Sequence, residues 1–539
     1  MNENNNLYSG QPMTQQNGQP CYNNYHPYPA QYQAVPKREP IEFTSAEKKL
    51  SYAALILGFL FVQFVFWNVK GYFTTAVFIL IFSVIGIYLH KKEYKFSTSN
   101  KIWSAILYIF STTFSITDNS FIKNLDMIFL IIGEAYLIYS VTTKRPMFGQ
   151  FSVFEIAKST LADPLSHFDK EFLAANSQIK MSRTGKYFKT IIGGLIVAVP
   201  LTVIVGALLV SADPGVERMI TTIIDAINIP NLFTFIEKIF VSIPVAAYIF
   251  GQIYSHTNPD KIKALNEEDC STSIRKLRMI QNAAIYSAIT PICVLYVMFF
   301  ISQANYFLSA FMGSLPENYG YADYARRGFF ELFAIELINA GVIFVMNFFS
   351  KKTGEEKPLA LKLYSIVIAV FTLLITATAI SKMVLYIRNF GLTQLRVYTT
   401  WFMVLTAFAF IFIIIRQFRH SFPFLRAAAV TFTIFFAVLC FSRPDALIAR
   451  YNMENCTDSM TFNDIREMTL LSSDAAAIVL EPEYAFTVDR MYENARYYEY
   501  KNFDSGRAYL ENITNHHINH DPYYQYNFSS FMLKQVMKE

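Results

Sequence analysis

Long apolar runs alternate with short polar and basic stretches along most of this chain. Each run approaches the length of about 20 residues that an α-helix needs to cross the hydrocarbon core of a bilayer. The pattern predicts an all-α fold, a polytopic integral membrane helical bundle of about eleven transmembrane helices. The predicted spans cover residues 50–69, 72–89, 102–117, 125–141, 187–210, 232–253, 282–303, 328–350, 359–387, 396–416 and 422–441.

Composition indicates the same class. Of the 539 residues, 53% are hydrophobic and 16% are charged, whereas soluble globular domains carry about 25% charged residues. The five cysteines show no zinc-ligand spacing, so we expect neither a disulfide framework nor a metal or other cofactor. A Walker A, dinucleotide-binding or GxSxG motif is not found in the sequence, so enzymatic activity is not favoured. The expected partner is the lipid bilayer and not nucleic acid.

Lysine and arginine residues near the span ends orient the predicted bundle. They cluster in alternate loops, as the positive-inside rule requires of cytoplasmic loops. The clusters are Lys48 and Lys49; Lys91, Lys92, Lys95 and Lys101; Lys144 and Arg145; Arg275, Lys276 and Arg278; Lys351 and Lys352; and Arg416, Arg419 and Arg426. This distribution predicts a multi-pass protein of the cell membrane with a cytoplasmic N-terminus and an extracytoplasmic C-terminus. Residues 442–539 carry 9 basic and 15 acidic side chains, which agrees with an external position.

The same patterns divide the chain into five predicted parts. They are a disordered cytoplasmic tail rich in Asn, Gln, Tyr and Pro (1–46), a four-span N-terminal membrane region (47–141), a cytoplasmic linker with an amphipathic helix (142–186), a seven-span membrane core (187–441) and a small helical extracytoplasmic tail domain (442–539). In the last part, Thr461 and Asp464 are expected to cap a helix that presents Phe462, Ile465 and Met468 on one side. This tail is a candidate contact for envelope protein partners, and the oligomeric state stays open.

Charged side chains inside the predicted spans are the main candidates for a functional site. A charge at the centre of a membrane helix costs about 2.5–3.5 kcal/mol, so it is usually paired or lines a wet cavity. The candidates are Glu134, Glu331, Glu336 and Lys382, with Arg326 and Arg327 beside them, and secondarily Glu237 and Lys238. Glu134 is interpreted either as a functional acid or as a hydrogen-bond partner of Tyr136 or Tyr139.

Depth in the membrane predicts which of these charges meet. The eighth span enters from outside, which puts Glu331 about 5 Å and Glu336 about 12 Å below the surface at 1.5 Å per residue. The ninth span returns to that surface and leaves Lys382 about 8 Å below it. We therefore expect Lys382 to pair with Glu331 or Glu336, with Arg326 or Arg327 above them. Such a cluster is either a structural ion pair or a proton or ion relay.

Prolines and histidines supply two weaker signals. Pro200, Pro244 and Pro291 lie near the middle of three successive spans, and prolines that kink helices recur at transporter sites. They are candidate hinges. His516 and His520 in the tail have the i, i+4 spacing of two metal ligands, but no general base accompanies them, so they are weak candidates for a metal site.

Three stretches carry a family resemblance. They are YGYADYARRGFFEL (319–332), SKMVLYIRNFGLTQLRVYTTWFM (381–403) and FSRPDALIARYN (441–452). They resemble a bacterial membrane family catalogued as domain of unknown function 4173, which is related to domain 4153. The resemblance extends loosely over residues 185–480 and implies a multi-span envelope protein, commonly of Gram-positive bacteria. It implies no activity, so no catalytic role follows for any residue.

Two classes of function remain after these observations. The first is a transporter or ion-coupled permease, favoured by the intramembrane charges and the prolines in the spans. The alternative is an envelope sensor or assembly scaffold with no transport activity. A wet cavity that reaches Glu134 or Glu336 near the middle of the membrane is expected for a transporter, whereas a dry, tightly packed bundle with a grooved outer tail is expected for a scaffold.

Overall fold

The computed structural model describes residues 42–67, 71–177, 232–258, 265–312, 329–351, 358–495, 503–518 and 526–538, together with scattered positions between 194 and 219. Within these ranges the chain is helical and contains no β-strand, only an isolated bridge between Ile280 and Ser350. The prediction of an all-α membrane protein is confirmed. The five-part division stays a prediction, and most of its first part lies outside the described residues.

Nine candidate membrane spans are found among the described residues. They are formed by α1 (Ser45–Phe61) continued by η1 (Val62–Phe66), α2 (Tyr72–Lys91), α5 (Ser120–Thr143), α11 (Leu232–Thr257), α13 (Asn282–Met312), α15 (Phe329–Phe349), α16 (Leu359–Phe390), α17 (Gln394–Phe418) and α18 (Phe424–Phe441). All nine overlap predicted spans. The predicted span at 187–210 lies largely outside the described residues, so the count of eleven is not confirmed.

The predicted span at 102–117 differs in the structure. It forms two shorter helices, α3 (Thr98–Phe110) and α4 (Thr113–Ile116). At the break, the Ser111 and Thr112 hydroxyls donate to the carbonyls of Tyr108 and Ile109, at 2.7 Å in both cases. Such local bonds compete with helical hydrogen bonding, and α3 is shorter than the span length of about 20 residues.

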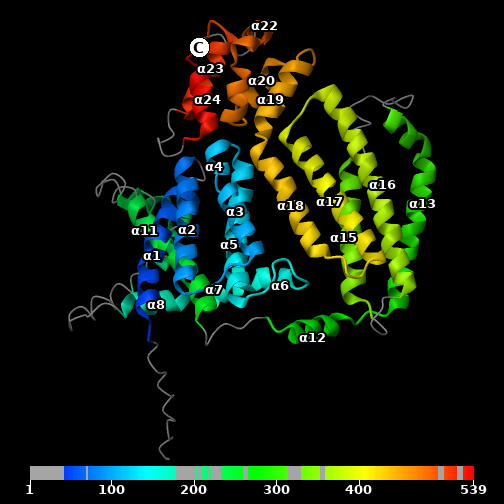
Figure 1. The fold of residues 1–539 in the computed structure, drawn as a ribbon. Helices are drawn as coiled ribbons and strands as arrows, with labels where there is room; N and C mark the ends of the chain where they lie inside the picture. The colour runs from blue at the N-terminus through cyan, green and yellow to red at the C-terminus, as the bar shows by residue number, and fades with distance from the viewer. Residues whose placement is uncertain are drawn as a thin grey trace, which may run out of the picture. The chain divides into compact units, whose positions relative to one another are not determined.

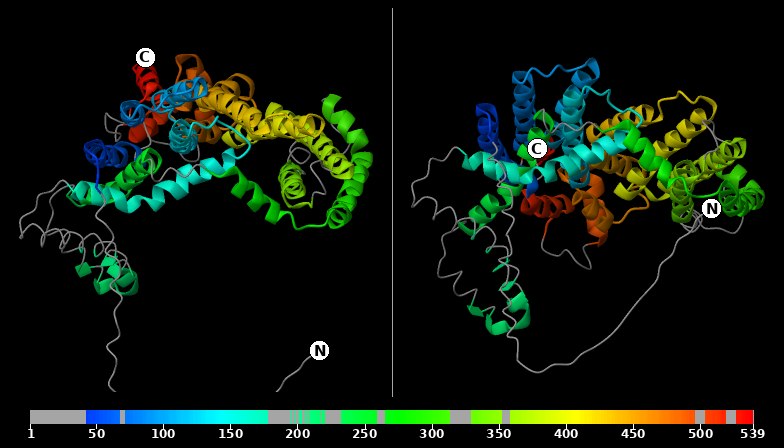
Figure 2. Two further views of the ribbon diagram at one scale, coloured as in Figure 1. Left: turned by 60° about the horizontal axis from the view of Figure 1, so that its bottom comes forward. Right: turned by 90° about the horizontal axis from the view of Figure 1, so that it is seen from below.

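The spans pack in two groups that α18 connects (Figures 1 and 2). In the first group α1 packs on α11, and the approach is so close that a Cβ on Gly58 would lie 2.8 Å from the Ala246 nitrogen. In the second group α16 packs on α13, α15 and α17. Helix α18 contacts α17 on one side and α5 on the other, where Phe436 and Phe129 have ring centroids 5.4 Å apart.

Short helices lie at both ends of α5. At its C-terminal end are α6 (Ser152–Ala157), η2 (Lys158–Ala162), α7 (Asp163–Ser166) and α8 (Phe168–Asn176), while α12 (Glu267–Leu277) precedes α13. Beside its N-terminal end are α19 (Pro444–Asn455), α20 (Phe462–Thr469), α21 (Ser473–Val479), η3 (Pro482–Tyr484), α22 (Ala485–Ala495), α23 (Gly506–Ile518) and α24 (Phe528–Val536). The two sets therefore occupy opposite ends of α5 (Figure 1).

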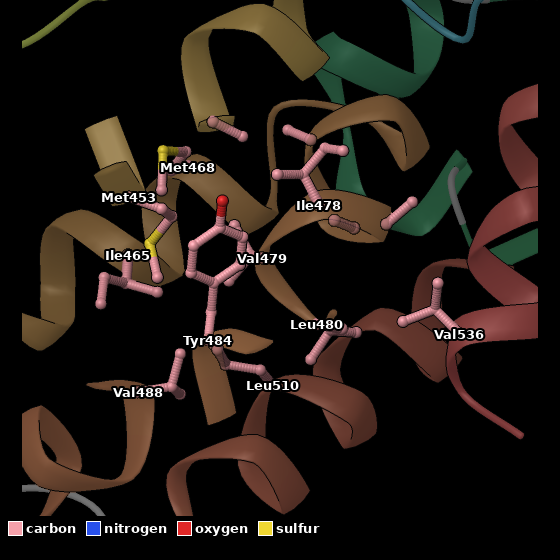
Figure 3. Close-up of a cluster of buried hydrophobic side chains, with 14 of the residues drawn as sticks. Met453, Ile465, Met468, Ile478, Val479, Leu480, Tyr484, Val488, Leu510 and Val536 are labelled. Carbon is pink, nitrogen blue, oxygen red and sulfur yellow. The ribbon is translucent and has the colours of Figure 1, made fainter. Parts of the chain in front are cut away.

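Helices α19–α24 share one hydrophobic core (Figure 3). The Thr461 hydroxyl accepts from the Asp464 nitrogen while the Asp464 carboxylate accepts from the Thr461 nitrogen, which is the capping box predicted for α20. Phe462, Ile465 and Met468 are buried in the core, as the periodicity predicted. The local helix is therefore confirmed, whereas the external position of α19–α24 stays a prediction.

Candidate functional site

A polar seam lies between the antiparallel helices α15 and α16, and it contains several predicted site residues. We define it by Glu331, Glu336 and Asn339 of α15 and Thr372, Thr376 and Lys382 of α16. Its pairs run in opposite directions along the two helices: Glu331 acts electrostatically on Lys382, Glu336 interacts with Thr376, and Asn339 donates to Thr372 at 2.9 Å.

The pairing of Lys382 with Glu331 or Glu336 stays a prediction, and the two glutamates have different surroundings in the seam. Glu331 is the carboxylate that acts on Lys382. Glu336 is 1% exposed and accepts a hydrogen bond from the Thr406 hydroxyl of α17. The two side chains that interact with Glu336 are therefore threonines, Thr406 of α17 and Thr376 of α16. Arg326 and Arg327 lie outside the described residues, so their place above the cluster stays a prediction.

The environment of Glu134 differs from the hydrogen-bonded alternative considered above. Glu134 is 5% exposed on α5. Tyr136 instead accepts from the Phe148 nitrogen at 2.7 Å and donates to Glu155 at 3.3 Å. Tyr139 accepts from the Leu265 nitrogen at 3.1 Å. Both tyrosines therefore anchor the segments that follow α5 and α11, and the functional role of Glu134 stays a prediction.

The secondary candidates are partly described. Glu237 is exposed and Lys238 half-buried on α11, which continues through Pro244, and α13 continues through Pro291. Their hinge roles stay predictions, and Pro200 lies outside the described residues. His516 is exposed in the last turn of α23, and His520 is outside the described residues. Among the described residues there is no group of three or more His, Cys, Asp or Glu side chains placed to hold a metal ion.

An apolar groove lies between α5 and α18. Its volume is about 800 Å³, which falls in the range of roughly 300–1,000 Å³ typical of small-molecule sites. Helices α3, α6, α15 and α17 complete the walls. The lining is dominated by aromatic and aliphatic side chains, including Trp103, Phe121, Ile128, Phe129, Phe333, Trp401, Phe402, Ala428, Ala429, Phe432, Phe436 and Leu439. Neither Glu134 nor Glu336 is among the lining residues.

The apolar groove follows most of the length of a membrane span. On α5 it runs from Phe121 to Tyr136, which corresponds to about 22 Å at 1.5 Å per residue. The hydrocarbon core of a bilayer is about 30 Å thick. Lining residues such as Phe121 and Ile128 remain 48% and 51% exposed, so the groove reaches the protein surface. Tyr398 lies at one end of the groove and Ser152 at the other.

A buried polar cluster, which we call the junction cluster, lies at the N-terminal end of α5. Its centre is Asp474 of α21, which is fully buried. One carboxylate oxygen accepts from the Thr117 hydroxyl at 2.7 Å and the Asp118 nitrogen at 2.8 Å. The other accepts from Arg443 Nε at 2.6 Å and from the Ser529 hydroxyl. Asp474 thereby connects the α4–α5 loop, the α18–α19 turn and α24.

Asp445 extends the junction cluster toward α17. It accepts from Asn119 Nδ2 and from Gln394 Nε2, both at 2.8 Å, and burial raises the pKa of its carboxyl. The Asn119 amide also donates to the Tyr398 hydroxyl at the end of the apolar groove. Two of the stretches that carry the family resemblance, 381–403 and 441–452, therefore meet here.

Sequence reasoning did not single out the junction cluster. Its acids stand in loops and short helices outside the predicted spans, where carboxylates are usually solvated. One usable signal was the Arg-Pro-Asp sequence at 443–445 in a resemblance stretch. Arg443 has a φ angle of 51°, which is uncommon for a residue other than glycine. Its guanidinium donates to Asp474 from this backbone conformation.

Titratable groups also gather at the opposite end of α5. Asp163 lies 3.3 Å from His256 Nε2 and 2.5 Å from Lys158 Nζ. Burial opposes ionisation of Asp163, but these two partners together lower the pKa of its carboxyl. Glu171 of α8 is 1% exposed and accepts from the Ser51 hydroxyl at 2.9 Å, and burial raises the pKa of its carboxyl to about 8.

The E171Q variant is expected to be more stable than the native chain, by a margin that grows as the pH rises. The pKa of Glu171 is raised above the ordinary value of 4.5, so its contribution to stability is greatest below pH 4.5 and is lost as the pH rises to about 8. Glutamine has no such dependence, so the E171Q protein should gain a few kcal/mol relative to the native chain across this window. Melting curves between pH 5 and pH 8 measure the difference.

Asp169 provides the matched control because it lies on the same helix with a side chain 61% exposed. D169N should show no comparable gain with pH. An equal effect of both variants would assign the result to net charge and contradict the role of Glu171.

A comparison with known protein families gives a match. The family described as Domain of unknown function (DUF4153) matches residues 104–481, which is well over half of the chain. This is the family related to domain 4173, the family that the three stretches resemble. The match begins at residue 104, earlier than the expected residue 185, and its end at residue 481 agrees with the expected 480. Comparisons with curated proteins and with solved structures gave no match.

Proposed function

Since the chain belongs to the DUF4153 family, whose function is unknown, we propose a function from its own geometry. It is a multi-pass membrane transporter that binds the hydrocarbon chain of an amphiphilic lipid in the apolar groove and moves that lipid between the two leaflets. The observation that carries this proposal is the groove itself, which is apolar along about 22 Å and has Tyr398 and Ser152 at its two ends.

The lining of the apolar groove favours a lipid over an ion or a small polar solute. A polar solute loses its hydration in such a site and finds few hydrogen-bond partners. A hydrocarbon chain loses nothing comparable, because lipid tails and aliphatic side chains are similarly apolar. Specific binding must then come from close packing on the aromatic walls and from the residues at the two ends. Tyr398 is already fixed there by Asn119, which makes this end suited to a headgroup.

Replacing Ala429 with tryptophan is expected to prevent chain binding, because Ala429 lines the apolar groove and the larger ring would fill it. A phospholipid with a photoreactive acyl chain, reconstituted with the full-length protein, should label α5 and α18 peptides in the native chain. We expect about a tenfold lower yield in A429W, which corresponds to a loss of about 1.4 kcal/mol in binding. Movement of a fluorescent phospholipid between leaflets should fall in parallel.

Ala427 supplies the matched control, because it lies on α18 two residues away and is not among the groove residues. A427W should retain labelling and movement. Labelling spread evenly over all lipid-facing helices, or equal effects of both tryptophans, would overturn the proposal. That outcome would favour the alternative, in which α19–α24 serve outside the membrane as a scaffold for envelope partners and the junction cluster anchors them.

A further inference from the structure

The Glu336 carboxyl is surrounded by hydroxyl groups that can each serve as donor or acceptor. Thr406 Oγ1 hydrogen-bonds Glu336 and lies 3.0 Å from the carbonyl oxygens of both Phe402 and Met403. Thr376, which also interacts with Glu336, has its Oγ1 2.9 Å from the Thr372 carbonyl oxygen. A hydroxyl carries one proton and two acceptor lone pairs, so it can donate to only one of these groups at a time.

The direction of these hydrogen bonds depends on the protonation state of Glu336. When the carboxyl is ionised, the threonine hydroxyls must turn away from the helix carbonyls and donate to it. When it is protonated, it can donate its own proton to a hydroxyl oxygen while that hydroxyl donates to its helix carbonyl. Both states are therefore hydrogen-bonded without movement of heavy atoms, whereas an ion pair with lysine or arginine would satisfy only the ionised state.

We propose that Glu336 is a reversible proton-binding site inside the membrane, with the Thr376 and Thr406 hydroxyls exchanging donor and acceptor roles. The Glu336 carboxylate takes up one proton from the aqueous solution and becomes a carboxylic acid. Release of that proton to the solution restores the carboxylate. This proposal goes beyond the proposed lipid transport, since Glu336 does not line the apolar groove.

The groups around Glu336 agree with this role. On its own helix and on α16 the nearest charges are Glu331 and Lys382, which act on each other. From α13, Tyr296 donates to Asn339. Helix α17 presents Thr406 and Met403, and the segment that follows α12 meets the C-terminal end of α15, where the Ile280 nitrogen donates to the Phe349 carbonyl at 3.1 Å. A 1% exposed carboxylate in this setting is costly to ionise, so a proton can compete for it.

Apolar packing separates the proton-binding position from the charged end of the polar seam. Leu332, Ile375, Ala379 and Met383 form one buried cluster with Met403. Leu332 of α15 and Ala379 of α16 lie between the level of Glu331 and Lys382 and the level of Glu336 and Thr376, and Met383 and Ile375 flank them on α16. The polar seam therefore has a charged end near the start of α15 and a hydroxyl-rich part at Glu336, with apolar side chains between them.

Infrared difference spectra between acid and alkaline pH test the proposal on the full chain in phosphatidylcholine nanodiscs. The native protein should show a carbonyl stretch of a protonated carboxylic acid that disappears as the pH rises. E336Q should lose this component. T376V and T406V should shift its frequency and its titration midpoint, because each removes one hydroxyl partner.

Thr378 provides the matched control for Thr376. It is buried two residues away on α16, and its hydroxyl donates to the Leu374 carbonyl at 2.8 Å. T378V should leave the carboxylic acid component unchanged. An unchanged spectrum in E336Q overturns the proposal, as does a component that responds to sodium and not to pH. If E336Q fails to fold, equal spectra of T376V and T378V overturn the proton-binding proposal. Lipid labelling of the apolar groove tests the transport proposal independently of these spectra.

Discussion

Replacing Asp474 with alanine is expected to destabilise the protein by about 3–5 kcal/mol, the cost of breaking a buried ion pair by removing one partner. The substitution leaves Arg443 without its carboxylate and removes the acceptor of the Thr117 and Ser529 hydroxyls. The Asp118 nitrogen also loses its bond. Because the site is fully buried, water cannot readily replace these bonds.

Thermal melting of the purified protein measures the total effect, and limited proteolysis locates it. Cleavage should increase first in α24, because Ser529 connects this helix to Asp474. Asp458, an exposed residue of the same region, supplies the control, and D458A should melt as the native chain does. Similar melting of D474A and D458A would show that Asp474 does not hold these segments together.

The parts of the fold that follow from local sequence were predictable. Hydropathy locates a span because each residue in contact with lipid must be apolar, whatever its neighbours are. The α20 cap was predictable for the same reason, since Thr461 and Asp464 are three residues apart and bond each other. The antiparallel approach of α15 and α16 also followed from chain order, whereas the ion pair of Lys382 with Glu331 or Glu336 stays a prediction.

Contacts between distant segments could not be predicted in this way. The bond from Thr117 to Asp474 joins residues 357 positions apart, and no local pattern marks either one. The Glu336 partner Thr406 depends on which face α17 turns toward α15, which a uniformly apolar helix does not specify. The apolar groove is similarly invisible, because residues such as Phe432 that line it have the same character as residues that face lipid.

Replacing Gly391 with alanine is expected to destabilise the α16–α17 turn for two separate reasons. Gly391 has φ of 72° and ψ of −177°, a region that only glycine occupies readily, and other residues lose about 1–3 kcal/mol there. A Cβ would also lie 2.5 Å from Asn452 Oδ1. Overpacking of this kind costs about 1–3 kcal/mol. The expected loss in thermal stability is therefore on the order of 3 kcal/mol.

Asn452 allows the two causes to be separated. Its side chain accepts from the Leu392 nitrogen at 2.7 Å and donates to the Leu392 carbonyl at 2.9 Å, so N452A alone should also be destabilising. In the double variant G391A/N452A the clash between the new Cβ and the Asn452 side chain is absent. Only the backbone strain at position 391 then adds to the lost hydrogen bonds. The double variant should accordingly lose less stability than the sum of the single ones.

Gly86 is the control for a glycine substitution that meets no obstacle. It lies in α2 with nothing within 4 Å of its Cβ position, so G86A should leave stability unchanged or raise it by up to about 1 kcal/mol. Strict additivity of G391A and N452A would place the whole effect in the backbone dihedral angles. A melting temperature of G391A equal to that of G86A would mean that the turn adjusts to a Cβ at position 391 without strain or clash.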